Sequence, residues 1–169
     1  MRDSRLLAAA FCTLFASVSS AQDSPQTIIA PPFAAYPAKE MGVSAPPANL
    51  RFNSAQARRF RTAIRDASKE KPNFAGHFRI ATWGCGTDCR GFAIIDLVSG
   101  KITTPMGIET ISGAMGNDDP RLDFRADSQL LVISGQINED PASEARHLLR
   151  WNGNKLIPIS KEPLPKTLF

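Results

Sequence analysis

Residues 78–104 decide the fold, and they read FRIATWGCGTDCRGFAIIDLVSGKITT. The segments 78–83 and 92–98 are rich in β-branched and aromatic residues, which favour strands. A Ser-Gly turn signal then leads into a third short strand at residues 101–104. The pattern predicts an antiparallel meander of three strands, in which a loop that contains two cysteines joins the first two.

A second unit with the same order of elements follows later in the chain. Its three strands are expected at residues 130–137, 147–151 and 155–159. Asn152-Gly153 is a hairpin signal between the last two strands, and Pro158, which lacks an amide donor, places the last strand at a sheet edge. The weak repeat is similar to β-propeller blades, but two blades are too few to close a propeller. We expect one twisted antiparallel sheet or two packed sheets.

An amphipathic helix is expected over residues 52–70, before the first strand. Asn53 or Ser54 can accept hydrogen bonds from the first free amides of the helix. One apolar stripe follows from the i, i+4, i+7 spacing of Phe60, Ile64 and Ala67. The predicted fold class is therefore α+β, mainly antiparallel β with one N-terminal helix packed on the sheet.

The first 21 residues have the features of a secretory signal peptide. Arg2 and Arg5 precede a short apolar run, and small residues stand before a cleavage site after Ala21. Residues 22–50 are rich in Pro and Ala and predict an extended segment that serves as a tether or as a strap on the domain surface. The alternative is a recognition segment whose apolar residues dock on the domain or on a partner. Residues 51–169 then form a single β-rich domain. The expected location is the periplasm or the outside of the cell.

The composition is that of an ordinary globular protein, with 43% hydrophobic and 21% charged residues among 169. These fractions argue against disorder and against a polytopic membrane protein. No segment after the signal is long and apolar enough to span a membrane, so we expect no stable membrane insertion once the signal is removed. The net charge of +4 is too weak to indicate a nucleic-acid partner.

Cys85 and Cys89 lie four residues apart in the loop between the first two strands, beside Gly84 and Gly86. Glycine permits the backbone angles that a small disulfide ring requires. In an exported chain that has lost Cys12 with its signal, two thiols remain, and pairing is their default state. We therefore predict a disulfide that shapes this loop more than it holds the domain together.

Three chemical alternatives stay open for the cysteines. A thiol-redox pair would normally be C-x-x-C at a helix N-terminus. A zinc site would have to include His77 and His147, at a spacing that matches no usual zinc finger. A cysteine nucleophile activated by His77 would need a reduced thiol in an oxidising compartment. We expect no cofactor and no metal.

His77 begins a predicted strand, and Asp96 interrupts an apolar strand just before a turn. We expect Asp96 to accept hydrogen bonds from the turn amides and His77 to be a hydrogen-bonded structural residue. The functional alternative is an envelope hydrolase that uses His77 with Asp88 or Asp96. No G-x-S-x-G, H-E-x-x-H, P-loop or dinucleotide motif occurs in the sequence.

Three stretches of the chain are distinctive together. Residues 73–77 read NFAGH, residues 83–89 read WGCGTDC, and residues 92–101 read FAIIDLVSGK. They resemble an uncharacterised family of small secreted or periplasmic bacterial proteins with the motif Asn-Phe-Ala-Gly-His followed by Trp-Gly-Cys-Gly-Thr-x-Cys. The resemblance covers roughly residues 52–104. It implies export and brings no activity with it.

The leading hypothesis is an exported binding domain of the bacterial envelope that recognises a protein or another cell-envelope ligand. Its motivation is a disulfide-closed loop on a β scaffold without a recognisable catalytic set, which favours a binding module over an enzyme. The candidate binding surface comprises Trp83, Thr87, Asp88 and Arg90, with the loop at residues 138–146 nearby.

Overall fold

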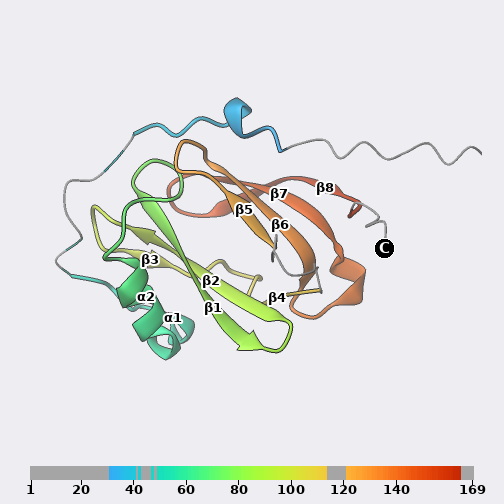
Figure 1. The fold of residues 1–169 in the computed structure, drawn as a ribbon, viewed down its shortest axis with the longest axis horizontal. Helices are drawn as coiled ribbons and strands as arrows, with labels where there is room; N and C mark the ends of the chain where they lie inside the picture. The colour runs from blue at the N-terminus through green and yellow to red at the C-terminus, as the bar shows by residue number, and fades with distance from the viewer. Residues whose placement is uncertain (1–30, 41, 43–46, 48, 114–120, 165–169) are drawn as a thin grey trace, which may run out of the picture.

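A computed structural model describes residues 31–40, 42, 47, 49–113 and 121–164 of the chain (Figure 1). The expected signal peptide, its cleavage site and the extended segment up to residue 30 lie outside the described residues. Within the described ranges, no helix combines the length and the apolar character needed to cross a membrane.

The protein is mainly antiparallel β-sheet with few helices. Its strands are β1 (Phe78–Gly86), β2 (Cys89–Asp96), β3 (Ile102–Thr103), β4 (Ile111–Ser112), β5 (Leu122–Phe124), β6 (Leu130–Ile137), β7 (Ala145–Trp151) and β8 (Leu156–Glu162). Its helices are α1 (Ala55–Arg59) and α2 (Arg61–Ala67), with 3-10 turns η1 (Phe33–Ala35) and η2 (Pro141–Ser143).

The strands form two halves that meet at β4. In the first half β2 pairs with β1 and β3, and in the second β7 pairs with β6 and β8. The short strand β4 pairs with the start of β2 on one side and with the end of β6 on the other. Further along, β3 pairs with the edge of β2 that β4 also uses. In the other half, β5 pairs with the edge of β6 that β4 also uses. In the described chain the halves are therefore joined as one sheet at β4 alone, and they separate away from it (Figure 1).

The central strands are buried on both faces, which explains their nearly continuous apolar sequence. In β2, Phe92 and Ile94 face the core between the two halves, whereas Ala93 and Ile95 face outward. Strand β6 alternates in the same way between the core and its own outer face. Each half thus needs a cover on its outside.

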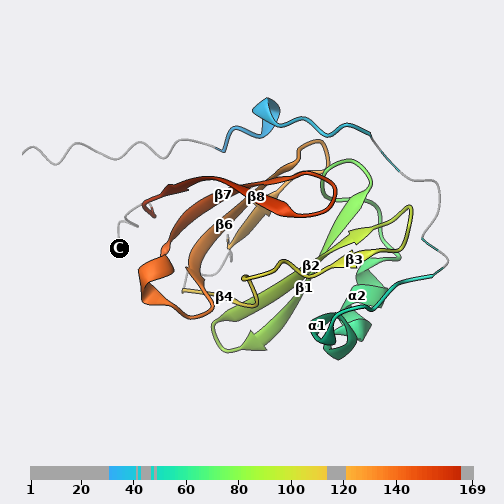
Figure 2. The same ribbon diagram turned by 180° about the vertical axis from the view of Figure 1, so that it is seen from behind.

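The helices cover the outer face of the first half, and the chain before them covers the second. Ile64 and Ala57 pack on the outward residues of β1 and β2. Residues 31–40, here called the strap, bury Phe33 on the outer face of β6 and β7. Figures 1 and 2 show the helices beside β1 to β3 and the strap beside β5 to β8. Docking of the expected extended segment on the domain is thus seen for the strap.

Two adjoining segments stand where a single helix is expected over residues 52–70. Ser54 accepts a hydrogen bond from the amide of Ala57 and so caps α1, at a donor–acceptor distance of 3.0 Å. The backbone leaves helical geometry at Phe60, with φ −103° and ψ 26°, before α2 begins. At this break the ring of Phe60 lies flat on Trp83, with 4.5 Å between the ring centroids.

Two short strands lie between the two predicted three-stranded units, where the sequence analysis predicts no strand. They are β4 and β5, and both fall between residues 104 and 130. Strands of two and three residues are too short for an alternation of apolar residues to show, and their partners are distant in the sequence. Strand β8, which contains Pro158, is the last strand of the sheet order, as the missing amide of that proline predicts.

Candidate functional site

The tip of the β1–β2 hairpin, residues 84–90, is closed by a disulfide between Cys85 and Cys89, as predicted. The two Cα atoms are 5.1 Å apart. The register of the hairpin shifts between Gly84 and Gly86, where the chain bulges. Cys85 is exposed, whereas Cys89 is buried.

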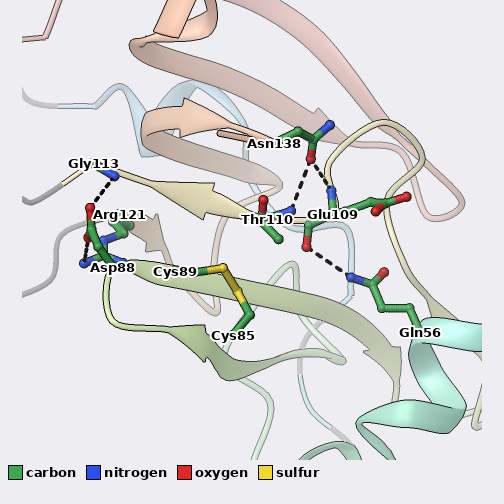
Figure 3. The surroundings of a disulfide bond; sticks show 9 residues. All are labelled: Gln56, Cys85, Asp88, Cys89, Glu109, Thr110, Gly113, Arg121 and Asn138. Carbon is green, nitrogen blue, oxygen red and sulfur yellow. Dashed lines mark hydrogen bonds and ion pairs between the residues drawn. A yellow bond between two sulfur atoms is a disulfide. The ribbon is translucent and has the colours of Figure 1, made fainter. Parts of the chain in front are cut away.

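Asp88 fastens the tip to the rest of the domain (Figure 3). One carboxylate oxygen accepts a hydrogen bond from the amide of Gly113 at 2.9 Å, and the other lies 2.7 Å from an Arg121 guanidinium nitrogen. The Arg121 side chain is 10% exposed and that of Asp88 41%. Asp88, a predicted member of the binding surface, is thus partly exposed, and its carboxylate also holds the residue after β4 and the residue before β5.

Asn138 fastens the other end of β4 (Figure 3). Its side-chain oxygen accepts from the amides of Glu109 and Thr110 at 2.8 and 3.2 Å, and its amide nitrogen donates to Gly107 at 2.9 Å. Gln56 of α1 donates to the carbonyl of Glu109 at 3.1 Å. Sequence reasoning did not single out Asn138. Its backbone has a φ of 56°, which asparagine tolerates better than most residues. The residue type at this turn is therefore the one feature of the sequence that could have pointed to Asn138.

Trp83, also a predicted member of the binding surface, is a buried residue that lines a groove beside the disulfide. It is 8% exposed, and Phe60 stacks on it. Its indole crosses the neighbouring strand at Gly91, where a Cβ atom would lie 2.3 Å from the indole nitrogen. Residue 91 must therefore lack a side chain if Trp83 is to lie flat under Phe60.

A groove of about 450 Å³ opens beside this aromatic pair, and we call it the disulfide groove. Phe60 and Trp83 line it together with the disulfide. Its remaining walls come from α1, from the segment leading into β4 and from the β6–β7 loop, and their polar side chains are Gln56, Arg59, Glu109, Thr110 and Glu139. Four segments that are distant in the sequence therefore bring charges of both signs around an apolar base.

The four predicted surface residues do not form one patch. Thr87 is exposed at the tip, Asp88 anchors it, and Trp83 lines the groove. Arg90 is half-buried, and strand alternation directs it to the opposite face of β2 from Cys89.

The other end of the hairpin brings together the predicted polar pair, His77 and Asp96. A histidine ring nitrogen lies 3.6 Å from an Asp96 oxygen, and the other ring nitrogen lies 3.9 Å from a carboxylate oxygen of Glu40 in the strap. Asp96 accepts hydrogen bonds from the amides of Val98 and Ser99 and from the Ser99 hydroxyl, at 2.9, 3.0 and 2.6 Å. It therefore holds the turn, as its position in the sequence predicts.

The ionisation of Asp96 reflects these contacts. Burial on its own would raise the pKa of this carboxyl group. The hydrogen bonds from Ser99 and Val98, helped by the electrostatic attraction of His77, outweigh burial and lower the pKa below its ordinary value of 3.8. The group is thus held as a carboxylate.

The order of these groups does not match a serine hydrolase. In a Ser-His-Asp triad the histidine stands between the serine and the acid, because it must take the hydroxyl proton. Here the carboxylate of Asp96 stands between Ser99 and His77. Asp88 is not brought to His77 either, because Phe78 pairs with Asp96 at one end of the hairpin and Gly86 with Cys89 at the other.

The NFAGH motif, residues 73–77, makes structural contacts with β1 and with the strap. The side-chain amide of Asn73 accepts from the amide of Ile80 at 2.8 Å and donates to its carbonyl at 3.3 Å, so it replaces a neighbouring strand at the edge of β1. Gly76 has a φ of 92°, and a Cβ there would lie 1.5 Å from the carbonyl oxygen of Glu40. The motif therefore seats the strap against the start of β1.

Among the residues that the structure describes, no group of three or more His, Cys, Asp or Glu side chains is placed to hold a metal ion. The ring of His147 contacts the carbonyl of Ser143 at 2.8 Å, and the two cysteines are bonded to each other. The residues of the zinc alternative are thus not gathered.

Neither a family model, nor a curated protein, nor a solved structure matches this chain. Its function is therefore inferred from the geometry of its own residues.

Proposed function

We propose that the protein is an exported binding domain of the bacterial envelope, not an enzyme, and that it holds a protein ligand in the disulfide groove. The observation that carries this proposal is the convergence of Phe60, Trp83, the disulfide, Arg59 and Glu139 on one groove. An aromatic base with charges of both signs at its walls suits a polypeptide that places an apolar side chain between charged ones.

Rigidity supports the proposal. The disulfide closes the tip, Asp88 ties it to Gly113 and Arg121, and Asn138 ties the facing segment down. A surface that is already ordered loses little conformational entropy when a ligand binds. The walls of the groove are thus prepared for a partner before it arrives.

Export is part of the same proposal. Its supports are the signal-like residues 1–21, the resemblance of residues 52–104 to small secreted bacterial proteins, and a disulfide, which persists in oxidising compartments. Protein recovered from the cell envelope should have an intact mass that lacks residues 1–21. It should also weigh about 2 Da less than the reduced form, because a disulfide lacks two hydrogens. A free-thiol signal in native protein, or a retained N-terminus, would contradict export with oxidation.

The proposal is tested by photo-crosslinking in living cells. A photoreactive residue replaces Glu139 at the wall of the groove, and the matched control replaces Val98, which is exposed at the opposite end of the hairpin. We expect a discrete crosslinked protein from position 139 and none from position 98. Arg59→Glu, combined with the probe at position 139, should reduce the crosslink several-fold. Equal crosslinking from both positions, or no effect of Arg59→Glu, would contradict the proposal.

The two enzymatic alternatives have less support. A hydrolase that uses His77 would need a nucleophile beside the ring, but the serine next to Asp96 is on the far side of the carboxylate. A thiol-redox role for Cys85 and Cys89 would gain from a helix N-terminus at the cysteines, but both lie in strands at a hairpin tip. Esterase or disulfide-reductase turnover by the purified protein would favour these alternatives over binding.

A further inference from the structure

A larger cavity, of about 980 Å³, lies on the side of the molecule where the two halves of the sheet separate. We call it the apolar cleft. One wall is the connection from β3 to β4, which contributes Met106 and Ile108, and the other is the β7–β8 hairpin. Its volume is within the range of about 300–1,000 Å³ that is usual for small-molecule sites.

The inner wall of the apolar cleft is continuous with the core. Leu149 and Trp151 belong to the core between the two halves, and Ile108 and Leu156 pack against it. Because strand pairing joins the halves through β4 alone in the described chain, no strand closes the space between the β3 side and β7. A side-chain hydrogen bond from Lys101 to Asn154 crosses between the halves there. Core side chains therefore line a space that a ligand can enter.

Apolar side chains also extend to the mouth of the cleft. Met106 is 98% exposed and Ile159 is 40% exposed, and both line the cavity. Large exposed apolar residues at the rim of an apolar cavity mark a place where a ligand removes them from water. The cleft therefore offers an apolar path from its mouth to the core.

The charges at the cleft have one sign. Its titratable lining residues within the described ranges are Lys155, Lys161 and His147, without an acidic residue. Both lysines are exposed, and Lys161 is positioned by a hydrogen bond of 3.1 Å to the carbonyl of Ala142. The two lysines stand at opposite ends of β8, about 20 Å apart along the strand. An apolar interior with a cation at each end complements a molecule that has a long apolar chain and one anionic end.

We propose that the apolar cleft binds a single long-chain fatty acid. Its hydrocarbon chain lies along Leu149, Trp151 and Leu156, and its carboxylate lies at one end of the cleft, beside either Lys155 or Lys161. A peptide fits less well, because it would bring backbone amides and carbonyls against walls that are largely apolar and would leave those groups without partners. The site is separate from the disulfide groove and does not depend on the proposed protein ligand.

The test uses the full exported chain and cis-parinaric acid, a fatty acid that fluoresces when it is bound. We expect saturable binding of one molecule per chain. The double variant Lys155→Glu with Lys161→Glu should bind this probe about tenfold more weakly, because it replaces the attraction for the carboxylate by repulsion. Arg61→Glu with Lys71→Glu makes the same change of charge on exposed residues outside the cleft lining, and it should bind like the natural chain.

Two further measurements separate the parts of the ligand. The uncharged methyl ester of the probe should bind the natural chain and the Lys155→Glu, Lys161→Glu variant alike. The double variant Met106→Ser with Ile159→Ser should weaken binding of the acid and of the ester by a similar factor. Val98→Ser, at an exposed valine outside the cleft lining, is the matched control and should leave both affinities unchanged.

The proposal is overturned if the natural chain shows no saturable binding, or if the charge-reversed and control variants bind the acid equally. It is also overturned if a chain that ends at Leu164 binds the probe more than tenfold more tightly than the natural chain. That result would assign the cleft to residues 165–169 as an internal occupant. A dimer that dissociates when the probe is added would assign it to a second copy and would overturn the proposal as well.

Discussion

The β1–β2 hairpin carries a polar cluster at each end, and the two clusters use their polar groups differently. At the tip, Asp88 bonds to residues outside the hairpin, so the loop is fixed while a groove stays open beside the disulfide. At the base, Asp96 bonds within its own turn and to His77. A carboxylate that bonds to distant segments holds them together and can thereby shape a groove between them. A carboxylate that caps its own turn has its oxygens occupied by hydrogen bonds from that turn.

The largest effect is expected at the base, from Gly76→Val. The new Cβ would lie 1.5 Å from the carbonyl oxygen of Glu40, and the residue has a φ of 92°, so the strap must move. We expect a loss of about 3 kcal/mol in the free energy of unfolding, measured by urea denaturation. Gly153→Val is the matched control, because Gly153 has a φ of 95° with no atom within 4 Å of a Cβ. Equal losses would show that contact with the strap contributes nothing.

A smaller effect is expected at the tip, when the disulfide is removed by Cys85→Ser with Cys89→Ser. A ring of this size limits the unfolded chain modestly, so the expected loss is about 2 kcal/mol in the free energy of unfolding. Crosslinking from position 139 should fall by a larger factor than the folded fraction does. If stability falls while crosslinking by the folded protein is unchanged, the disulfide holds the domain and does not shape the groove.

The third effect concerns the carboxylate at the tip. Asp88→Ala removes the acceptor of the Gly113 amide and the partner of Arg121, and it should cost about 1.5 kcal/mol. Asp88→Asn keeps an acceptor for the amide and removes the charge, so its loss should be smaller. Urea denaturation of the two variants separates the hydrogen bond from the ion pair. Identical losses would mean that the hydrogen bond to Gly113 adds nothing.

The smallest effect is expected for Asp96→Asn, at about 1 kcal/mol near neutral pH. Because the pKa of Asp96 is lower in the folded chain than in the unfolded chain, its carboxylate stabilises the fold above the ordinary value of 3.8. This stabilisation is lost as the pH falls through the lowered pKa. Urea midpoints should therefore differ between the natural chain and Asp96→Asn at neutral pH and converge in acid. A difference that grows in acid would contradict this sign.

Much of the architecture follows from local patterns. The long strands β1, β2, β6, β7 and β8 were expected near their observed positions, because their apolar runs and turn signals lie within a few residues of each other. The pairing of Cys85 with Cys89 and the turn held by Asp96 were predictable for the same reason. Each depends on groups that are at most four residues apart.

The candidate sites were less predictable. Trp83 was expected in the binding surface, but it is covered by Phe60, which stands at the break between α1 and α2 more than twenty residues earlier in the chain. Asp88 was expected at the tip, but its bonds to Gly113 and Arg121, which follow β4 in the chain, were not predicted. No local sequence pattern predicts such contacts, because the two partners are more than twenty residues apart in the chain.

The sequence by itself therefore determined the long strands, their turns, the closed tip and the prediction of export, because these depend on residue type and short spacing. Only the tertiary structure decided that β4 joins the two halves, that the disulfide lies in a groove, and that an apolar cleft opens where the halves separate. The physical reason is that burial and ion pairing depend on which distant surfaces meet, and that is settled when the halves pack together.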